Sequence, residues 1–162
     1  MDTPTPVRSL SEKDVLEAAA RLVGAFSRTD TAAYFAAFAP EATFVFHTEP
    51  ARLESRTEYE ALWASWLADG WSVTACESSD AHVQVYGTSA VFSHTVLTTA
   101  GTPGASATSR ERETIVFTLS DNRILAVHEH LSPIPEPGFI LESDAADADA
   151  ADAGGTPVVA VA

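Results

Sequence analysis

The sequence predicts an α+β domain in which three N-terminal helices pack on one face of a strongly curved antiparallel sheet. Up to residue 70, apolar residues recur mainly at helical spacing between capping residues. From Trp71 onward, strand-forming segments follow one another between short polar turns. Helices gathered first and strands gathered later are typical of α+β domains, because such helices cover one face of the sheet.

Two helices are predicted within the first forty residues. Ser11 is a capping residue with Asp14 as its partner, and apolar residues then recur at helical spacing until about residue 27. Asp30 caps a short second helix, which Pro40 stops. The aromatic residues of that second helix are Tyr34, Phe35 and Phe38.

A third helix carries two tryptophans. It opens at a capping box, either Ser55-x-x-Glu58 or Thr57-x-x-Glu60, and closes at Asp69-Gly70. Its apolar residues are Leu62, Trp63, Trp66 and Leu67. Tyr34, Tyr59, Trp63 and Trp66 are candidates to roof a ligand cavity, and their spacing is equally that of ordinary core.

The remaining segments are predicted to be strands. Asp121-Asn122 is a tight turn between the last two strands. The segment from Gly101 to Thr108 is a hairpin loop and not a phosphate cradle, because it neither follows a buried parallel strand nor opens a helix. The predicted strands are 43–47, 71–78, 81–86, 89–99, 110–119 and 124–132.

Composition narrows the classes of partner. The 162 residues are 46% hydrophobic, enough for one core, and 23 acids against 9 bases give a net charge of −14. Such a surface repels phosphate backbones and anionic lipids, so neither a nucleic acid nor a membrane is an expected partner. The first residues lack the apolar core of a signal peptide, so a cytoplasmic location is expected.

The single cysteine and the acidic C-terminal segment bear on metal binding and on the domain boundaries. Cys76 is alone, which excludes an internal disulfide and a multi-thiolate metal site, and it is expected to be a buried, inert thiol. The expected boundaries are a disordered N-terminus over 1–10, one domain over 11–138 and a disordered Ala/Asp-rich tail over 139–162.

Side-chain alternation assigns the last two strands to two faces of the sheet. The more apolar set in each strand is expected to face the helices, and the other set is expected on the outer face. The inward set comprises Glu113, Ile115, Phe117 and Leu119, then Leu125, Val127, Glu129 and Leu131. The outward set comprises Arg112, Thr114, Val116 and Thr118, then Ile124, Ala126, His128 and His130.

Glu129 is the first candidate for a catalytic residue, with Glu113 as a second cavity carboxylate. An apolar wall disfavours the charged form of a carboxyl group, so its pKa rises toward the range useful for proton transfer. Alternatively, Glu129 lies solvated near the strand end or pairs with an arginine. His47, which ends the first strand, is the next candidate base, although a lone histidine there is more often a surface residue. Tyr34 is expected to supply a hydroxyl group across the cavity.

The paired imidazoles have three competing interpretations. His128 and His130, together with His94, Arg112 and Thr114, are expected to form a polar contact between two copies of the chain. The alternatives are an acid–base role in the pocket and a metal site built from imidazole nitrogens. We favour the contact between copies, and expect neither a metal nor a cofactor.

The strand sequences resemble those of a known superfamily. The segments are Ala81-His-Val-Gln-Val-Tyr-Gly87, Glu113-Thr114-x-Val116, Asp121-Asn122 and Val127-His-Glu-His-Leu-Ser132. They resemble the SnoaL-like subgroup of the nuclear transport factor 2-like superfamily, closest to the association domain of calcium/calmodulin-dependent kinase II. The resemblance covers about residues 11–135 and implies a cone-shaped fold and a homodimer. It leaves the activity open, because ketosteroid isomerase, scytalone dehydratase, polyketide cyclases, binders and oligomerisation modules share this scaffold.

Departures from the family pattern concern the pocket. Ile124 stands where a tryptophan is usual. The kinase association domain lines its pocket with arginines, and the aligned positions here are Leu97, Ile115 and Leu131. The resemblance therefore implies an apolar pocket that does not favour a carboxylate ligand. The aspartate base and tyrosine–aspartic acid pair of ketosteroid isomerase have no matching residues, so steroid isomerisation is not carried over.

These observations predict a homodimer that holds a small apolar or polyketide-like molecule and performs cofactor-free acid–base chemistry. Isomerisation, dehydration or ring closure suits an apolar cavity with one or two polar groups. The alternative is a non-catalytic ligand-binding or oligomerisation module. An open cavity that reaches Glu129 favours the enzyme, and a closed core beneath Trp63 and Phe117 favours the module. The pocket walls predicted from the sequence are Tyr59, Trp63, Trp66, Leu97, Glu113, Ile115, Phe117 and Leu131.

Overall fold

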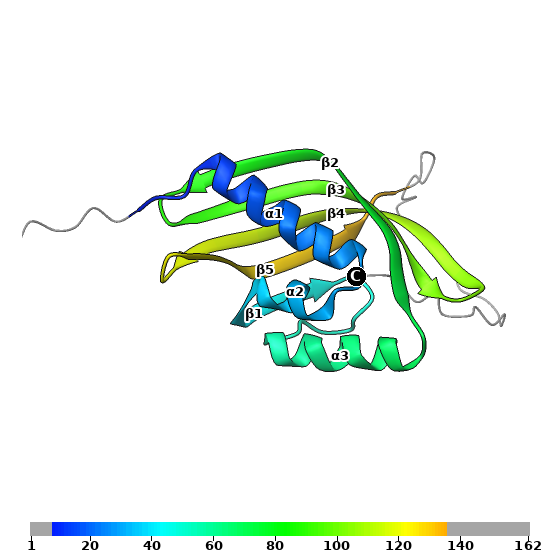
Figure 1. Ribbon diagram of the computed structural model, residues 1–162. Coiled ribbons are helices and arrows are strands. Elements are labelled where there is room, and N and C mark those ends of the chain that lie inside the picture. Colours follow the sequence, from blue (N-terminus) through cyan, green and yellow to red (C-terminus); the bar gives the residue numbers. More distant parts are fainter. Residues whose placement is uncertain (1–7, 136–162) are drawn as a thin grey trace, which may run out of the picture.

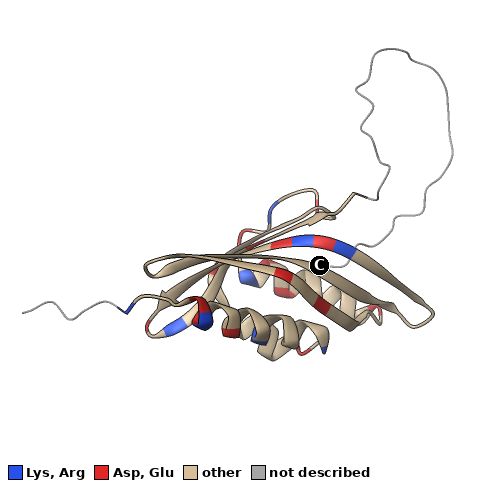
Figure 2. Cartoon of the chain, turned by 90° about the horizontal axis from the view of Figure 1, so that it is seen from above, with Lys and Arg blue, Asp and Glu red and all other residues tan. Residues whose placement is uncertain are grey.

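Three helices cover one face of a curved five-stranded sheet (Figures 1 and 2). The computed structural model describes residues 8–135, so the tail predicted for 139–162 lies outside the described residues. The helices are α1 (Glu12–Ser27), α2 (Thr31–Ala36) and α3 (Arg56–Ala68). The strands are β1 (Phe38–Phe46), β2 (Ser72–Tyr86), β3 (Ser89–Thr102), β4 (Ala105–Ser120) and β5 (Arg123–Pro133). No helix within residues 8–135 is both long and apolar enough to span a bilayer.

The sheet has the order β1-β5-β4-β3-β2 and is mixed rather than wholly antiparallel. β1 pairs with β5 in parallel, and every other pairing is antiparallel. β1 begins at Phe38, so Phe38 is a strand residue and not part of the second helix as predicted. Pro40 lies inside β1, where the register is irregular between Phe38 and Thr43. An edge strand tolerates proline because one side of its backbone needs no ladder partner.

The antiparallel strands are longer than the sequence predicts. The segments 71–78 and 81–86 form one strand, β2, with a register irregularity between Ser79 and His82. The loop between β3 and β4 is correspondingly short, because these strands run to Thr102 and from Ala105. The tight turn before β5 is as predicted: Asp121 and Asn122 have φ of 49° and 62°. Two positive φ values suit a two-residue hairpin turn.

A β-bulge in β5 changes which side chains face the helices. Val116 pairs with His128, and Phe117 pairs with Ala126, so Val127 has no partner in the ladder. After the bulge, Glu129 points inward and His130 outward, as alternation predicts. Before it the predicted pattern is wrong, because Ala126 is fully buried while Val127 is only half-buried.

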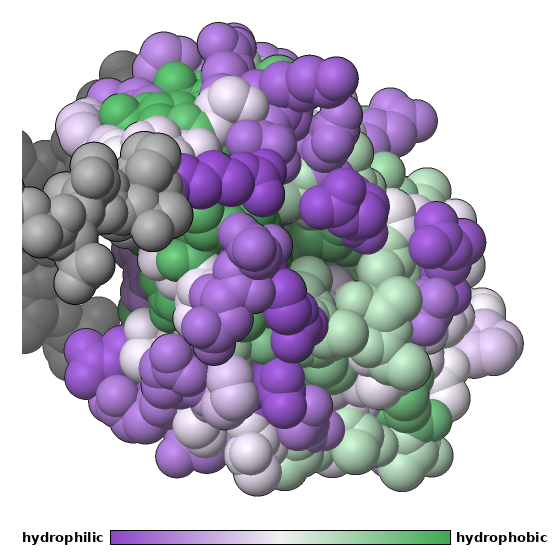
Figure 3. All heavy atoms as spheres, turned by 60° about the vertical axis from the view of Figure 1, so that its left-hand side comes forward, coloured by the Kyte–Doolittle hydropathy of each residue, from purple (hydrophilic) through white to green (hydrophobic). Residues whose placement is uncertain are grey.

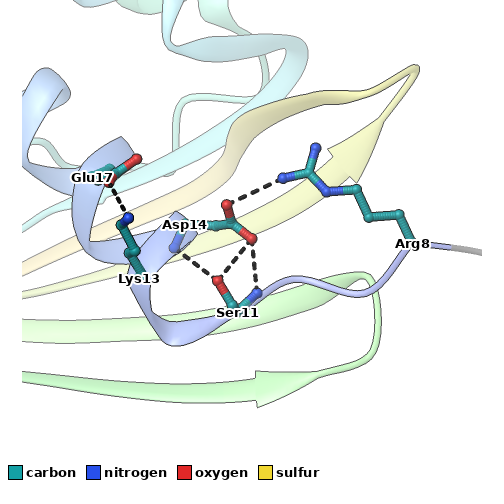
Figure 4. Close-up of polar contacts among 5 residues, drawn as sticks. All are labelled: Arg8, Ser11, Lys13, Asp14 and Glu17. Atoms are coloured by element: carbon teal, nitrogen blue, oxygen red, sulfur yellow. Dashed lines mark hydrogen bonds and ion pairs between the residues drawn. The ribbon is translucent and has the colours of Figure 1, made fainter.

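α1 is held at its start by a capping box (Figure 4). The Ser11 hydroxyl accepts a hydrogen bond from the Asp14 N–H at 3.1 Å, and the Asp14 carboxylate accepts from the Ser11 N–H at 3.0 Å. The preceding residue, Leu10, is buried, and its N–H donates to the carbonyl oxygen of Gly87 at 2.9 Å. These contacts hold the N-terminal end of α1 against the sheet.

Candidate functional site

The candidate site is an interior cavity between α1, α2 and the concave face of the sheet. Its volume is about 10 Å³, which is enough for about one water molecule. Because the cavity is this small, a larger ligand requires the α1 side chains that close it to move. The lining residues are Leu22, Val23, Phe26, Tyr34, Cys76, Val96, Thr98, Glu113, Glu129 and Leu131.

Glu129 is the most buried acid in this cavity, with 1% of its surface exposed. Tyr34 donates a hydrogen bond from its hydroxyl to Glu129 Oε2 at 3.2 Å, and the hydroxyls of Tyr34 and Tyr59 lie 3.3 Å apart. Burial raises the pKa of Glu129 well above its ordinary value, and the charge of Glu113 and a hydrogen bond with it raise the pKa further. The hydrogen bond from Tyr34 acts in the opposite direction. Glu129 is therefore neither solvated nor paired with an arginine.

The tyrosine hydroxyls are held in their neutral form. Burial, together with the charge of Glu129, raises the pKa of Tyr34 and of Tyr59 well above 10. Aromatic packing fixes both rings: Tyr34 stacks on Trp63 with centroids 5.2 Å apart, and Tyr59 lies 4.7 Å from the Phe44 ring. A hydrogen-bond donor is thus locked beside the buried acid.

A second carboxylate, Glu113 on β4, is bound to an imidazole. His94 Nε2 contacts Glu113 Oε2, and His94 Nδ1 lies 2.6 Å from the hydroxyl of Ser78. Ser78 is exposed, whereas His94 is buried. Ser78, His94 and Glu113 therefore form a polar chain from the surface of β2 to the carboxylate beside Glu129.

A third buried carboxylate, Glu111, is not among the site residues predicted from the sequence. It contacts Nε2 of His47, the predicted pocket base, and it accepts a hydrogen bond from the Ser109 hydroxyl at 3.1 Å. His47 remains partly exposed and does not line the cavity with Glu129. Alternation was the signal that could have found Glu111, since it precedes Glu113 on the inward side of β4.

Two of the predicted site residues lie on the face of the sheet opposite to the one predicted. His94, predicted at the outer contact between copies, lies inside, because β3 turns its even-numbered residues from Ala90 to Ala100 toward the core. Leu97, predicted in the pocket, is 41% exposed on the opposite face for the same reason. Of the other predicted wall residues, Glu113 and Leu131 line the cavity. The rest belong to the core or pack against it without lining the cavity, namely Tyr59, Trp63, Trp66, Ile115 and Phe117.

The remaining predicted interface residues lie on the outer face. Arg112 and His130 are exposed, Thr114 and His128 are half-buried, and the Thr43 hydroxyl lies 2.8 Å from His128 Nδ1. His94 is on the other side of the sheet, so these three histidines do not converge. Within residues 8–135 no group of three or more His, Cys, Asp or Glu side chains is arranged to hold a metal ion.

Cys76 lines the same cavity as an unreactive thiol. Burial raises its pKa to about 11, and the Thr98 hydroxyl donates to its Sγ at 3.5 Å. A thiol with a raised pKa is a poor nucleophile near neutral pH, because the thiolate is the reactive form. The chemistry of the cavity therefore rests on its carboxyl and hydroxyl groups.

Solved structures with this architecture are nuclear transport factor 2-like proteins. A superfamily protein from Salmonella enterica serovar Typhimurium is 17% identical with a TM-score of 0.68, and the match covers 82% of this chain and 96% of that one. A protein of unknown function in nutrient uptake from Rhodospirillum rubrum is 21% identical (TM-score 0.66; 75% and 99% covered). A protein from Streptomyces avermitilis, provisionally named a dehydratase, is 20% identical (TM-score 0.66; 75% and 95% covered). These likenesses establish the fold.

The sequence itself defines the family within that class. The model of the SnoaL-like domain family matches residues 15–137. The chain belongs to the SnoaL-like domain family, as the resemblance in its strands predicts. Comparison with curated proteins gives no match.

Proposed function

We propose that the chain binds a small, mostly apolar carbonyl compound in the interior cavity and moves a proton on it without a cofactor. The observation that carries this proposal is Glu129, a fully buried carboxyl with a raised pKa and a tyrosine hydroxyl as its partner. A carboxylic acid that keeps its proton at neutral pH can donate a hydrogen bond to a substrate oxygen. A cytoplasmic location is part of the proposal.

The residues divide into an acid side and a base side. The protonated Glu129 and the Tyr34 hydroxyl donate hydrogen bonds to the substrate carbonyl, whose oxygen gains negative charge when a neighbouring C–H bond loses its proton. The Glu113 carboxylate takes that proton, and His94 exchanges it with solvent through the exposed Ser78. Return of the proton to another carbon completes an isomerisation, and its transfer to a leaving hydroxyl group completes a dehydration. The dehydratase name of the Streptomyces avermitilis relative is consistent with the second outcome.

The test uses proton exchange as a readout, because isomerisation, dehydration and ring closure can all begin by loss of a proton next to a carbonyl. We expect the chain to catalyse deuterium exchange at the α-carbon of one or more members of a panel of cyclic enones and β-keto esters, followed by NMR in D₂O. Glu129→Gln, which keeps the shape and removes the acid, should slow exchange by about a hundredfold or more. Glu77→Gln, on the exposed part of β2, is the matched control.

Two results would count against the proposal. One is exchange at equal rates with the natural chain and with Glu129→Gln. The other is an ordinary carboxylate titration of Glu129, followed through its side-chain carbon by NMR, because an acid ionised at neutral pH does not donate a proton to the substrate.

The rival function is a non-catalytic module, and one observation favours it. The region beneath Trp63 and Phe117 is filled by side chains, since both residues are at most 1% exposed and the adjoining cavity is about 10 Å³. If no compound of the panel exchanges deuterium and none shifts the resonances of the cavity residues, the result would favour this second function.

A further inference from the structure

A large hollow lies on the outside of the molecule, on the other side of α1 from the interior cavity. It runs between α1, α2 and the β4–β5 turn and has a volume of about 750 Å³. Leu22 and Phe26 of α1 line the interior cavity, whereas Ala18 and Ala25 of the same helix line this groove. The face in Figure 3 shows hydrophilic side chains gathered around hollows whose deeper surface is hydrophobic. The deeper lining of the groove is made of small or apolar side chains, namely Ala18, Ala25, Ala37 and Phe117, and the exposed Ala33 lines it as well.

Arginines are concentrated around this groove. Four of the nine basic residues of the chain line it, although the chain as a whole carries a net charge of −14. The four are Arg8, Arg21, Arg28 and Arg123.

The two acids of the groove already have partners (Figure 4). Asp14 pairs with Arg8 at 3.1 Å and belongs to the capping box, and Glu17 lies 3.8 Å from the ammonium group of Lys13. Within residues 8–135, no carboxylate lies within ion-pair distance of Arg21, Arg28 or Arg123. The guanidinium groups of Arg21, Arg28 and Arg123 are therefore available to bind a ligand.

The fold brings these arginines to one place. Arg21 lies on α1 and Arg28 is the residue that caps the C-terminal end of the same helix, about two turns further along, with Ala25 between them. Gly24 leaves room for the second one, since a Cβ there would lie only 3.3 Å from Arg28 Nη1. Arg123 comes from a different element, because it follows the tight turn into β5.

We propose that this groove binds a small organic anion, with a carboxylate, phosphate or sulfonate group on the arginines and an apolar body on the alanine floor. Guanidinium groups bind such oxyanions through paired hydrogen bonds. Alanines leave a flat apolar surface within reach of that charge, and their small size leaves the volume open. The site is independent of the proposed function, because it uses no residue of the acid–base chain.

The test compares two fluorescent probes that differ in charge. 8-Anilinonaphthalene-1-sulfonate carries an anion on an aromatic body, and N-phenyl-1-naphthylamine is a similar body without the anion. We expect the full chain to bind the sulfonate probe more tightly than the uncharged naphthylamine probe. Binding of the sulfonate should shift the backbone amide resonances of Gly24, Ala33 and Asn122. Arg21→Gln and Arg28→Gln should each weaken it by about two- to fivefold, as removal of one exposed charge partner does. Arg110→Gln, an exposed arginine outside the groove, is the matched control and should leave the affinity unchanged.

A second variant separates a shaped groove from a diffuse positive charge. Ala33→Phe keeps every charge and places a bulky ring on a residue that lines the groove, so it should weaken binding of the sulfonate probe at least as much as Arg28→Gln does. Equal binding of both probes, or equal effects of Arg28→Gln and Arg110→Gln, would overturn the proposal. So would movement of the Gly24 and Asn122 resonances, without any probe, when Asp144, Asp147, Asp149 and Asp152 are changed to Asn. That result would assign the groove to the acidic tail of the chain itself.

Discussion

Glu129 is buried in the folded chain, and its carboxyl group holds its proton more tightly there than in the unfolded chain. In the folded chain its pKa lies well above the ordinary value of 4.5, because burial and the charge of Glu113 disfavour the ionised form. The folded state therefore binds more protons than the unfolded state once the pH exceeds that ordinary value. The stability that Glu129 contributes is fully present below the ordinary pKa of 4.5. It is lost as the pH rises through the higher pKa of the folded state.

Replacing Glu129 by Gln should flatten this part of the stability profile. Because Gln does not titrate, we expect the unfolding free energy of Glu129→Gln to increase relative to that of the natural chain as the pH rises above about 5, by at most about 1.4 kcal/mol per pH unit. Urea unfolding at four pH values measures the difference, with Glu77→Gln as the exposed control. Parallel profiles of Glu129→Gln and the natural chain would contradict the buried, protonated acid.

The His94–Glu113 pair should behave as a coupled buried unit. His94→Leu leaves the Glu113 carboxylate buried without its imidazole, and we expect it to destabilise the fold by about 3–5 kcal/mol. His94→Leu combined with Glu113→Leu should recover most of that loss, because two apolar groups need no partners. A double-mutant cycle by denaturant unfolding measures the coupling, and additive effects would mean that the contact contributes nothing.

The sequence could place individual side chains only where strand register was regular. Glu113 and Glu129 were found by alternation, and both line the cavity. The sequence pairs His94 with His128 and His130 by residue type alone, because it contains no register for β3. It predicts His47 in the cavity without its partner Glu111, since nothing in a strand's own sequence shows which side chain lies opposite it.

At the scale of elements, α1 separates the two hollows: it closes the interior cavity and forms one wall of the outer groove. Leu22 and Phe26 cover the interior cavity, and Arg21 and Arg28 border the groove. The helix is fixed to the sheet by packing along its length and by the hydrogen bond from the Leu10 N–H to the Gly87 carbonyl, and the capping box stabilises its first turn. Opening of the interior cavity to a ligand therefore requires α1 or its side chains to move, and the cap controls how firmly its N-terminal end is held.

Removing the cap should loosen that end. Ser11→Ala deletes the acceptor for the Asp14 N–H, and we expect a loss of about 1 kcal/mol of unfolding free energy with faster amide exchange in the first turn of α1. Ser65→Ala is the matched control: Ser65 sits inside α3 and bonds the Leu62 carbonyl, so alanine there should be neutral or slightly stabilising. Equal losses from the two substitutions would show that the cap itself contributes little.

Element boundaries were predictable where a local signal sets them. The Ser11 capping box and the Asp121-Asn122 turn are found as predicted, because both depend on neighbouring residues. Other features depend on distant residues. The parallel pairing of β1 and the edge position of Pro40 depend on β5, about 85 or more positions away along the chain. The bulge at Val127 depends on the register with the neighbouring strand β4. No local pattern encodes them.

At the scale of the whole molecule, the outer sheet face remains the predicted contact between two copies. It exposes Leu97 of β3 among polar side chains, with Arg112 on the adjacent strand β4 and His128 and His130 one strand further, on β5. We expect Leu97→Glu to shift the chain from dimer to monomer in sedimentation equilibrium, because it places a carboxylate in the contact. Leu16→Glu is the matched control, since Leu16 is exposed to a similar extent, 39% against 41%, but lies on α1. A monomeric natural chain, or equal effects of the two substitutions, would contradict the predicted contact.

Acid should weaken the same contact. Burial lowers the pKa of His128, and the nearby His130 and Arg52 lower it further, so the neutral imidazole is the form that suits this face. As the pH falls, His128 gains a proton beside those groups, and between two copies the added positive charges repel one another. We expect the dimer dissociation constant to rise as the pH falls below about 6.5, the ordinary imidazole value, because the lowered pKa delays protonation to more acidic pH. His128→Gln should remove most of that rise, whereas Ser11→Ala, far from the face, should leave it intact. A dissociation constant that does not change with pH would show that this imidazole lies outside the contact.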